Sequence, residues 1–180
     1  SSDSNYFFLI KELHLSLKNA GVLEEYDFAI LDTGLDSDQQ SYFRDNNSLI
    51  KKAEWNVEVP KYKILGRENL KTQVARAFLP DYFEDYKLYI WLDADMWLND
   101  IESFYLYEKG ALNNKLTIVP QSDRAYIKNA NVEWLFGFPK RIKTINYKNI
   151  SKSISKSLGR KYAFHSTLNA GAFAINDNVN

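Results

Sequence analysis

The chain has 180 residues, of which 23 are basic and 23 acidic, so its formal net charge is zero, and it contains no cysteine. This length favours one domain, and 45% hydrophobic and 15% aromatic residues exclude a disordered chain, a coiled coil or a collagen-like repeat. Without cysteine there can be no disulfide, thiol catalysis or cysteine-ligated metal, and the balanced charge argues against a general nucleic-acid binder. No apolar run approaches the roughly 20 residues that span a bilayer.

The apolar periodicity predicts helices that alternate with strands. Leu9, Leu13 and Leu17 recur four residues apart and indicate an amphipathic helix, and Pro80 is expected to end the third helix. The predicted helices cover residues 5–19, 37–45, 69–79 and 101–109. The predicted strands cover residues 26–32, 53–59, 87–93, 115–120 and 168–175.

This alternation predicts an α/β fold, with a mainly parallel sheet flanked by helices in a single domain. Ligands of such sheets bind beyond the carboxyl ends of the strands. Asp32, Asp93, Asp95 and Gln121 all fall at or just after predicted strand ends. One edge of the sheet is therefore expected to be acidic.

Positive charge is concentrated in residues 140–161, which hold eight basic residues and no acidic one, so the remainder carries a net charge of −8. The plainer interpretation is a solvated basic loop. The alternative is a patch that meets a phosphate, an anionic acceptor or a membrane surface.

The strongest chemical hypothesis concerns Asp93 and Asp95, at the end of the most apolar predicted strand. In extended backbone, side chains two residues apart point to the same side. Two carboxylates placed in this way could bind one hard divalent cation, Mg²⁺ or Mn²⁺, which keeps positions for water and a diphosphate. The alternative is that Asp93 caps a turn or the next helix while Asp95 is solvated.

Four motifs follow one another along the chain: Asp3-Ser-Asn5-Tyr6, Arg76, Asp93-Ala-Asp95 and Asn169-Ala170-Gly171. In this order they resemble the motifs of GT-A glycosyltransferases, and most of all those of family 8, the glycogenin and lipopolysaccharide galactosyltransferase group. The resemblance implies a GT-A, Rossmann-like domain for nucleotide-sugar binding over residues 1–180, with a basic insertion at about 139–162.

The resemblance places the first motif at the nucleotide of the donor. Asp3 and Asn5 would hydrogen-bond the uracil edge, and Tyr6 would stack on the ring. The alternative is that Asp3 or Ser4 caps the first helix and Tyr6 lies in the core, although capping and binding are compatible.

Arg76 is implied to lie beside the donor, where a guanidinium could hold a phosphate or a carboxylate. Its alternative role is a surface ion pair with Asp81 or Asp85.

The last motif is implied to line the sugar pocket. Asn169 would bind sugar hydroxyls, and Gly171 would let the backbone approach closely; the alternative is a buried strand with a glycine for packing. Ala94 and Ala170 are also implied to lie near the donor. Gln121 and Asp123 could face the sugar, although a role in a turn is the plainer interpretation for both.

The resemblance also implies an apolar strand before Ser1 and a third metal ligand beyond Asn180, so the chain is expected to be truncated at both ends. His14 and His165 are expected to be structural or surface residues rather than ligands.

These residues together predict metal-dependent transfer of a hexose, glucose or galactose, from a UDP-sugar to an acceptor hydroxyl. The resemblance implies retention of configuration, and no catalytic base stands out. The expected acceptor is a saccharide, a lipid-linked saccharide or a protein. The expected location is the cytoplasm, with peripheral membrane contact through residues 140–161.

Two other functions remain open. Asp93 could be the nucleophile of a haloacid-dehalogenase-like phosphatase, although that class prefers Thr or Val where Trp97 stands. The chain could also be a non-catalytic nucleotide-binding or interaction module, with the aromatic segment 133–138 covering a partner.

Overall fold

The computed structural model describes residues 1–113, 115–121 and 130–177. The chain divides into two compact units, Ser1–Thr117 with Gly171–Asn180, and Ile118–Ala170. The strands are β1 (Ser2–Asp3), β2 (Ala29–Gly34), β3 (Leu49–Lys52), β4 (Leu88–Leu92), β5 (Thr117–Pro120), β6 (Ala130–Leu135), β7 (Phe138–Thr144) and β8 (Leu168–Asn176). The α-helices are α1 (Phe7–Asn19), α2 (Ser37–Asp45), α3 (Lys61–Ile64), α4 (Lys71–Ala75), α5 (Leu79–Tyr82), α6 (Ile101–Ala111), α7 (Ile145–Ser153) and α8 (Lys156–Lys161). The 3₁₀ helices are η1 (Ser4–Tyr6), η2 (Val22–Glu24), η3 (Glu68–Leu70) and η4 (Arg76–Phe78).

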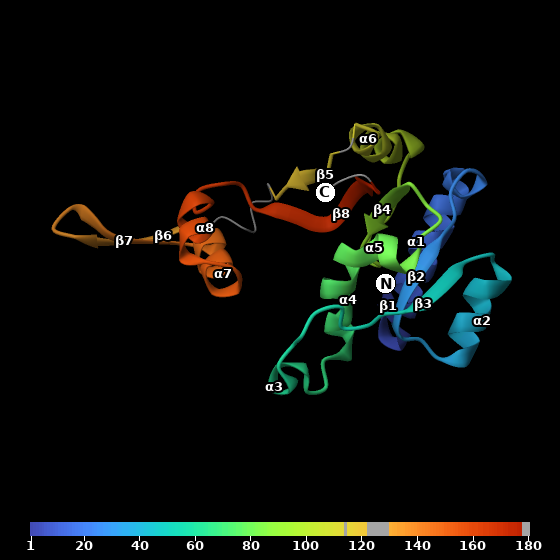
Figure 1. The fold of residues 1–180 in the computed structure, drawn as a ribbon. Helices are drawn as coiled ribbons and strands as arrows, with labels where there is room; N and C mark the ends of the chain where they lie inside the picture. The colour runs from blue at the N-terminus through green and yellow to red at the C-terminus, as the bar shows by residue number, and fades with distance from the viewer. Residues whose placement is uncertain (114, 122–129, 178–180) are drawn as a thin grey trace. The chain divides into compact units, whose positions relative to one another are not determined.

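The first unit contains a parallel sheet in the order β1-β2-β3 (Figure 1). Ala29 to Asp32 of β2 pair in register with Leu49 to Lys52 of β3, and Ser2 of β1 lies opposite Asp32. A second sheet has the order β4-β8-β5, and β8 runs antiparallel to β4. The predicted α/β fold is confirmed, while the antiparallel direction of β8 had no signal in the sequence pattern.

Helix α1 buries one face in the core of the first unit. Ile10, Leu13 and Leu17 are 2%, 3% and 4% exposed, whereas Leu9 is 42% exposed. The predicted amphipathic helix is confirmed, and its buried face follows the i, i+3, i+7 spacing of Ile10, Leu13 and Leu17 and leaves Leu9 outside. Each such side chain stabilises the fold by about 1.5–3 kcal/mol when it is fully buried.

The beginnings of two predicted helices are set by their caps. The Asp36 side chain accepts from the backbone N–H of Gln39, whose side chain accepts from the Asp36 N–H in return. At the start of α6, Asp100 accepts from the backbone N–H of Ser103, without a reciprocal bond among those described. The prediction that Pro80 ends a helix is wrong, because Pro80 lies in the first turn of α5. Its missing N–H has no intrahelical partner to lose there.

The predicted strand over residues 53–59 is also wrong. The Ala53 N–H still donates to the Asp32 carbonyl, 2.8 Å away, but the chain then leaves the sheet. The Tyr82 hydroxyl accepts from the Glu54 N–H and donates to Asn56 Oδ1. Hydrogen bonds to one side chain of α5 therefore replace a strand ladder in this segment.

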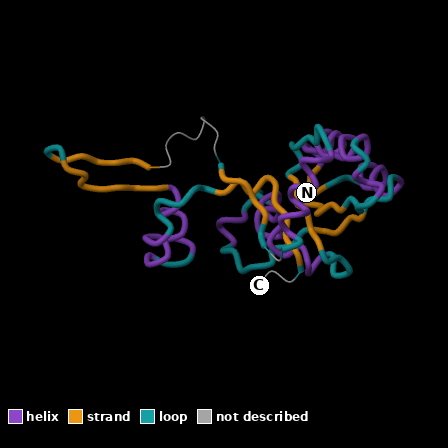
Figure 2. The backbone as a smooth tube through the Cα atoms, turned by 90° about the horizontal axis from the view of Figure 1, so that it is seen from above, coloured by secondary structure: helices purple, strands orange, loops and turns teal. Residues whose placement is uncertain are grey.

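The second unit contains an antiparallel hairpin, β6–β7, followed by α7 and α8 (Figure 2). Thr144 and Ser155 cap the two helices, and the helices pack so closely that a Cβ on Gly159 would collide with Ser151. The loop interpretation of residues 140–161 is therefore wrong, because these caps and this close packing order the stretch. The expected insertion, 139–162, falls inside the second unit.

In the part of the chain that the structure describes, no helix is both long and apolar enough to cross a bilayer.

His14 is a buried polar residue of α1, as its structural interpretation expects. It is 2% exposed, its ring lies 5.0 Å from that of Phe28 and 6.1 Å from that of Phe43, and its Nδ1 has no hydrogen-bond partner among the described residues. Burial, followed by the charge of Lys18, lowers the pKa of His14. The folded state therefore holds a neutral imidazole where the unfolded chain would protonate below about pH 6.5.

We predict that His14→Phe reduces the loss of stability on acidification. The folded chain binds fewer protons at this site than the unfolded chain, so the stabilising contribution is full above pH 6.5 and declines as pH falls. Urea unfolding at pH 7.5 and pH 5 measures the difference. His165→Phe, at an exposed histidine, is the control, and an equal acid loss in the parent and in His14→Phe would contradict the prediction.

Candidate functional site

The Asp93-Ala94-Asp95 motif follows β4 immediately. The Asp93 N–H donates to the Gly171 carbonyl, 2.7 Å away, and so extends the β4–β8 pairing by one bond. The chain then turns, because the Asp93 carbonyl accepts from the Met96 N–H at 3.0 Å. The expectation of extended backbone through Asp95 is therefore wrong, and the relative direction of the two carboxylates is set by a turn.

Ala94 anchors this turn. Its side chain is 9% exposed and belongs to the apolar cluster around Ile10 and Phe43, whereas Asp95 is exposed. The turn therefore presents Asp95 to solvent while Ala94 packs inward. The position of Ala94 near the donor, which the family resemblance implies, stays a prediction.

The Asp93 carboxylate has two partners from different parts of the first unit. Its Oδ1 accepts from the Trp91 indole N–H at 2.8 Å and lies 3.5 Å from a guanidinium nitrogen of Arg76. The Arg76 side chain is 15% exposed and also contacts Gln73 Oε1. Arg76 therefore pairs with Asp93 and not, as the alternative interpretation had it, with Asp81 or Asp85 at the surface. The α4–η4 segment instead brings Arg76 to the end of β4.

Trp91 is a site residue that the motif comparison missed. The available signal is its position two residues before Asp93, which places both side chains on the same side of a strand. Trp91 therefore orients Asp93 from within β4.

The α-amino end of β1 lies near the same pair. Ser1 Oγ donates to Thr72 Oγ1 at 2.7 Å, which ties β1 to α4. Burial lowers the pKa of the Ser1 α-amino group to about 5, with Asp93 opposing the shift and Arg76 adding to it. Residues from β1, α4–η4, β4 and β8 therefore converge around Asp93.

The first motif forms a capped turn at the end of β1. Asp3 Oδ1 accepts from the N–H groups of Asn5 and Tyr6, at 2.9 and 3.2 Å, so Asp3 caps η1, the 3₁₀ segment that leads into α1. The N-cap residue of α1 itself is Tyr6, which makes no side-chain capping bond. The alternative of a core position for Tyr6 is wrong, because Tyr6 is 50% exposed. Asn5 is also exposed, and the uracil-binding roles stay predictions.

Asp32, expected at the acidic edge, has a structural role. Its Oδ1 accepts from the N–H groups of Gly34 and Leu35, both at 2.7 Å, and its Oδ2 accepts from Gln40 Nε2 at 3.0 Å. These bonds close the turn after β2 and hold Gly34 at φ +146° beside Asp3. Asp32 thus shapes the turn next to the first motif.

The remaining expected residues belong to the second unit. Asn169 and Ala170 lie in β8, and the Gln121 N–H donates to the Thr167 carbonyl at 2.7 Å. Asp123 lies outside the described residues. The first unit thus brings together Arg76, Asp93 and Gly171, and the second holds Asn169, Ala170 and Gln121.

Among the described residues, no group of three or more His, Asp or Glu side chains is arranged to hold a metal ion. Asp93 and Asp95 offer carboxylate oxygens, the ligand type that Mg²⁺ and Mn²⁺ prefer. Such an ion commonly takes one or two protein carboxylates and completes its shell with water and phosphate oxygens. The donor set is therefore chemically suitable for an ion held jointly with a diphosphate.

The chain folds like the galactosyltransferase LgtC. It aligns with a crystal structure of LgtC in complex with donor and acceptor sugar analogues at a TM-score of 0.58 and 19% identity, over 99% of this chain and 56% of that one. It also aligns with an LgtC active-site mutant, a glutamine-to-glutamate change, at 0.56 and 20% identity, over 97% of this chain and 55% of that one.

The chain thus spans about half the length of the structures it matches. The likeness confirms the GT-A-like fold. No family model and no curated protein sequence matches the chain.

We predict that Asp32→Ala destabilises the first unit by about 2 kcal/mol or more, because it removes a carboxylate that accepts three hydrogen bonds. Urea unfolding measures the change. Asp38→Ala, at an exposed acidic residue of α2, is the matched control and should change stability by no more than about 0.5 kcal/mol. Equal effects of the two substitutions would contradict the structural role.

Proposed function

We propose that this chain is the nucleotide-sugar-binding part of a glycosyltransferase that moves a hexosyl group from a UDP-sugar to an acceptor hydroxyl. The observation that carries the proposal is the Asp93 turn at the end of β4, with Arg76 paired to Asp93, in a GT-A-like fold. The similar structure of LgtC holds donor and acceptor sugar analogues, which supports the same ligand classes here.

Asp93 and Asp95 would hold Mn²⁺ or Mg²⁺, and the bound ion would neutralise the negative charge that develops on the departing diphosphate. Trp91 and Arg76 keep Asp93 oriented at the end of β4. Arg76 would also offer a fixed cation to the diphosphate oxygens. Its charge favours departure of the UDP group, because charge stabilisation by preorganised groups lowers the barrier most.

The rest of the donor would be bound by the exposed end of the first motif and by β8. The Asp3 cap orders the backbone at Asn5 and Tyr6, whose exposed side chains would contact the uracil. On the sugar side we assign Asn169, Ala170, Gly171, Ala94 and Gln121, with glucose or galactose as the transferred group. Retention of configuration follows from the family resemblance, and no residue is assigned as a catalytic base.

We predict that Asp93→Ala and Asp95→Ala each weaken Mn²⁺-dependent UDP binding at least tenfold, measured by titration calorimetry. The reason is the loss of one of two carboxylates that hold the ion. Asp81→Ala, at an exposed aspartate of α5, is the matched control and should bind like the parent. Thermal unfolding checks that the variants are folded.

The same titration separates the other functions. If the affinity for UDP is the same with and without Mn²⁺, and the same in both variants as in the parent, Asp93 and Asp95 do not hold a metal ion. A phosphatase would instead trap fluorometallate on Asp93 without protection by UDP. A non-catalytic module would show no metal-dependent binding of UDP.

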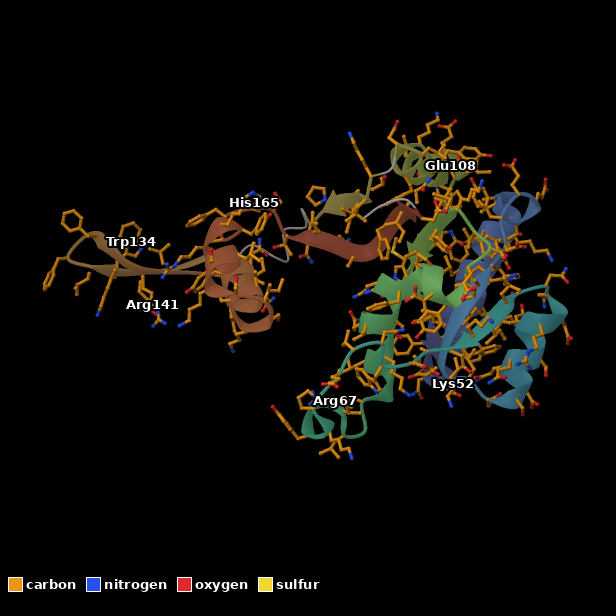
Figure 3. All side chains as sticks on the ribbon, viewed as in Figure 1. Lys52, Arg67, Glu108, Trp134, Arg141 and His165 are labelled. Atoms are coloured by element: carbon orange, nitrogen blue, oxygen red, sulfur yellow. The ribbon has the colours of Figure 1, made fainter. Side chains whose placement is uncertain are left out.

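We also propose that the second unit contacts an anionic membrane surface, where a lipid-linked saccharide acceptor would be presented. The hairpin tip exposes Trp134, Phe136 and Phe138 by 64%, 93% and 76%, with exposed Lys140 and Arg141 directly behind it. Trp134 and Arg141 extend to opposite sides of the hairpin (Figure 3).

Apolar side chains at the turn and on both strands suit a tip surrounded by lipid better than a face packed on a flat partner. Phe136, at φ +50°, and Gly137 form the turn, and Leu135 is paired with Phe138. The unit as a whole has ten basic and two acidic residues, which complements anionic headgroups. Aromatic side chains at the tip of a segment, with positively charged side chains behind them, are typical of proteins that anchor at a membrane interface.

We predict that the chain sediments with phosphatidylglycerol-containing vesicles and not with pure phosphatidylcholine vesicles. Trp134→Ser with Phe136→Ser, and separately Lys140→Ser with Arg141→Ser, should each reduce binding about tenfold or more. The control is Phe8→Ser with Tyr62→Ser, because both side chains belong to the first unit and each is 74% exposed. This variant should bind the vesicles like the parent. Equal binding by all variants would contradict the anchor.

A further inference from the structure

The two oxygens of the Asp93 carboxylate have different surroundings. Oδ1 accepts from the Trp91 indole N–H at 2.8 Å and lies 3.5 Å from a guanidinium nitrogen of Arg76. Oδ2 has neither a hydrogen bond nor an ion pair with any residue that the structure describes. The side chain is 36% exposed, so Oδ2 is the oxygen that a ligand from solvent can use.

Trp91 is held firmly by the neighbouring strand. It is 6% exposed and lies opposite Phe173 in the β4–β8 register, where the two rings stack with their centroids 6.2 Å apart and their planes at 16°. Such a cross-strand aromatic pair fixes the direction of the indole N–H. The backbone of Asp93 is held by β8 as well, through its N–H bond to the Gly171 carbonyl. Both ends of the Trp91–Asp93 hydrogen bond are therefore fixed, and the carboxylate keeps one orientation.

This hydrogen bond limits what Asp93 can offer to a cation. An ionised carboxylate has about two lone-pair positions on each oxygen, and the Trp91 N–H occupies one of those on Oδ1. The positive charge of Arg76 disfavours a second cation beside the same oxygen. Asp93 can therefore give a metal ion one oxygen, Oδ2, and not both.

Divalent cations differ in what they need from a carboxylate. Ca²⁺ takes about six to eight oxygens at roughly 2.3–2.6 Å and often uses both oxygens of one carboxylate. Mg²⁺ requires a compact octahedron and commonly combines one or two carboxylates with water and phosphate oxygens, and Mn²⁺ also accepts octahedral oxygen sites. Restricting Asp93 to one oxygen therefore deprives Ca²⁺ of a ligand that the smaller octahedral ions do not need.

We propose that Trp91 is a positioning residue that sets the metal preference of the Asp93–Asp95 pair, favouring Mn²⁺ and Mg²⁺ over Ca²⁺ by keeping Asp93 Oδ1 bonded to its indole N–H. The inference rests on the proposed function, because it requires a divalent ion held together with a diphosphate. It adds that the choice of ion is decided by a side chain that does not touch the ion.

The test is calorimetric titration of UDP into the chain in excess Mn²⁺ and, separately, in excess Ca²⁺. Trp91→Phe keeps an aromatic ring against Phe173 and removes the N–H. The ratio of the dissociation constant of UDP in Ca²⁺ to that in Mn²⁺ should fall at least about tenfold in this variant, because groups that orient a metal ligand typically change metal affinity by about 10–100-fold. A merely structural role would weaken both titrations together and leave the ratio unchanged.

The matched control is Trp97→Phe, at a tryptophan that is 59% exposed, and it should keep the ratio within about twofold of the parent. A second variant, Trp91→benzothienylalanine, keeps the size and shape of the indole and has sulfur in place of the N–H. It should lower the ratio as Trp91→Phe does, and it replaces Trp91→Phe if the smaller ring prevents folding.

The outcomes separate this inference from the proposed function. An unchanged ratio in a folded Trp91 variant, or a parent that binds UDP as tightly in Ca²⁺ as in Mn²⁺, would overturn the role of Trp91 and leave the proposed function intact. If Mn²⁺ does not strengthen UDP binding by the parent, the proposed function fails and the metal preference fails with it. Failure of both Trp91 variants to fold would assign the N–H to stability and would also overturn the proposal.

Discussion

The interaction on which the rest of the site depends is the pairing of the Asp93 carboxylate at the end of an apolar strand. Partial burial of a carboxylate without partners costs free energy. Asp93 has two partners, the Trp91 indole in β4 and Arg76 in η4, and these contacts hold η4 at the end of β4. The backbone of Asp93 is held as firmly, by the Gly171 carbonyl of β8. One residue thereby joins two strands and a helical segment.

The same arrangement lets the acidic motif fill a structural role and leaves Asp95 available for the proposed one. Ala94 is packed into the core, which fixes the turn, while Asp95 on its other side is exposed. Asp3 acts in a similar way, because one of its carboxylate oxygens caps η1 and thereby orders the backbone of the exposed residues Asn5 and Tyr6. In both motifs a short-range bond orders the backbone and leaves neighbouring side chains for a ligand.

The net charge of zero is the sum of two unlike regions. The second unit carries ten basic and two acidic residues and exposes aromatic side chains at a hairpin turn, whereas the first unit holds the aspartates of the motif turn. This separation of charge by unit agrees with the two proposals, a metal-diphosphate site in the first unit and contact with an anionic surface through the second. The folded hairpin gives the basic stretch a definite geometry.

The sequence by itself determined the α/β class and the elements α1, α2, α6 and β4, because apolar periodicity acts within a few residues along the chain. Tertiary structure alone decided that Arg76 pairs with Asp93 rather than Asp81 or Asp85, and that Tyr82 draws residues 54–56 out of a strand. It also decided that Leu9 faces out and that residues 130–144 form a hairpin. In each case the deciding partner lies far away in the sequence or depends on which face is covered, and local patterns do not encode that choice.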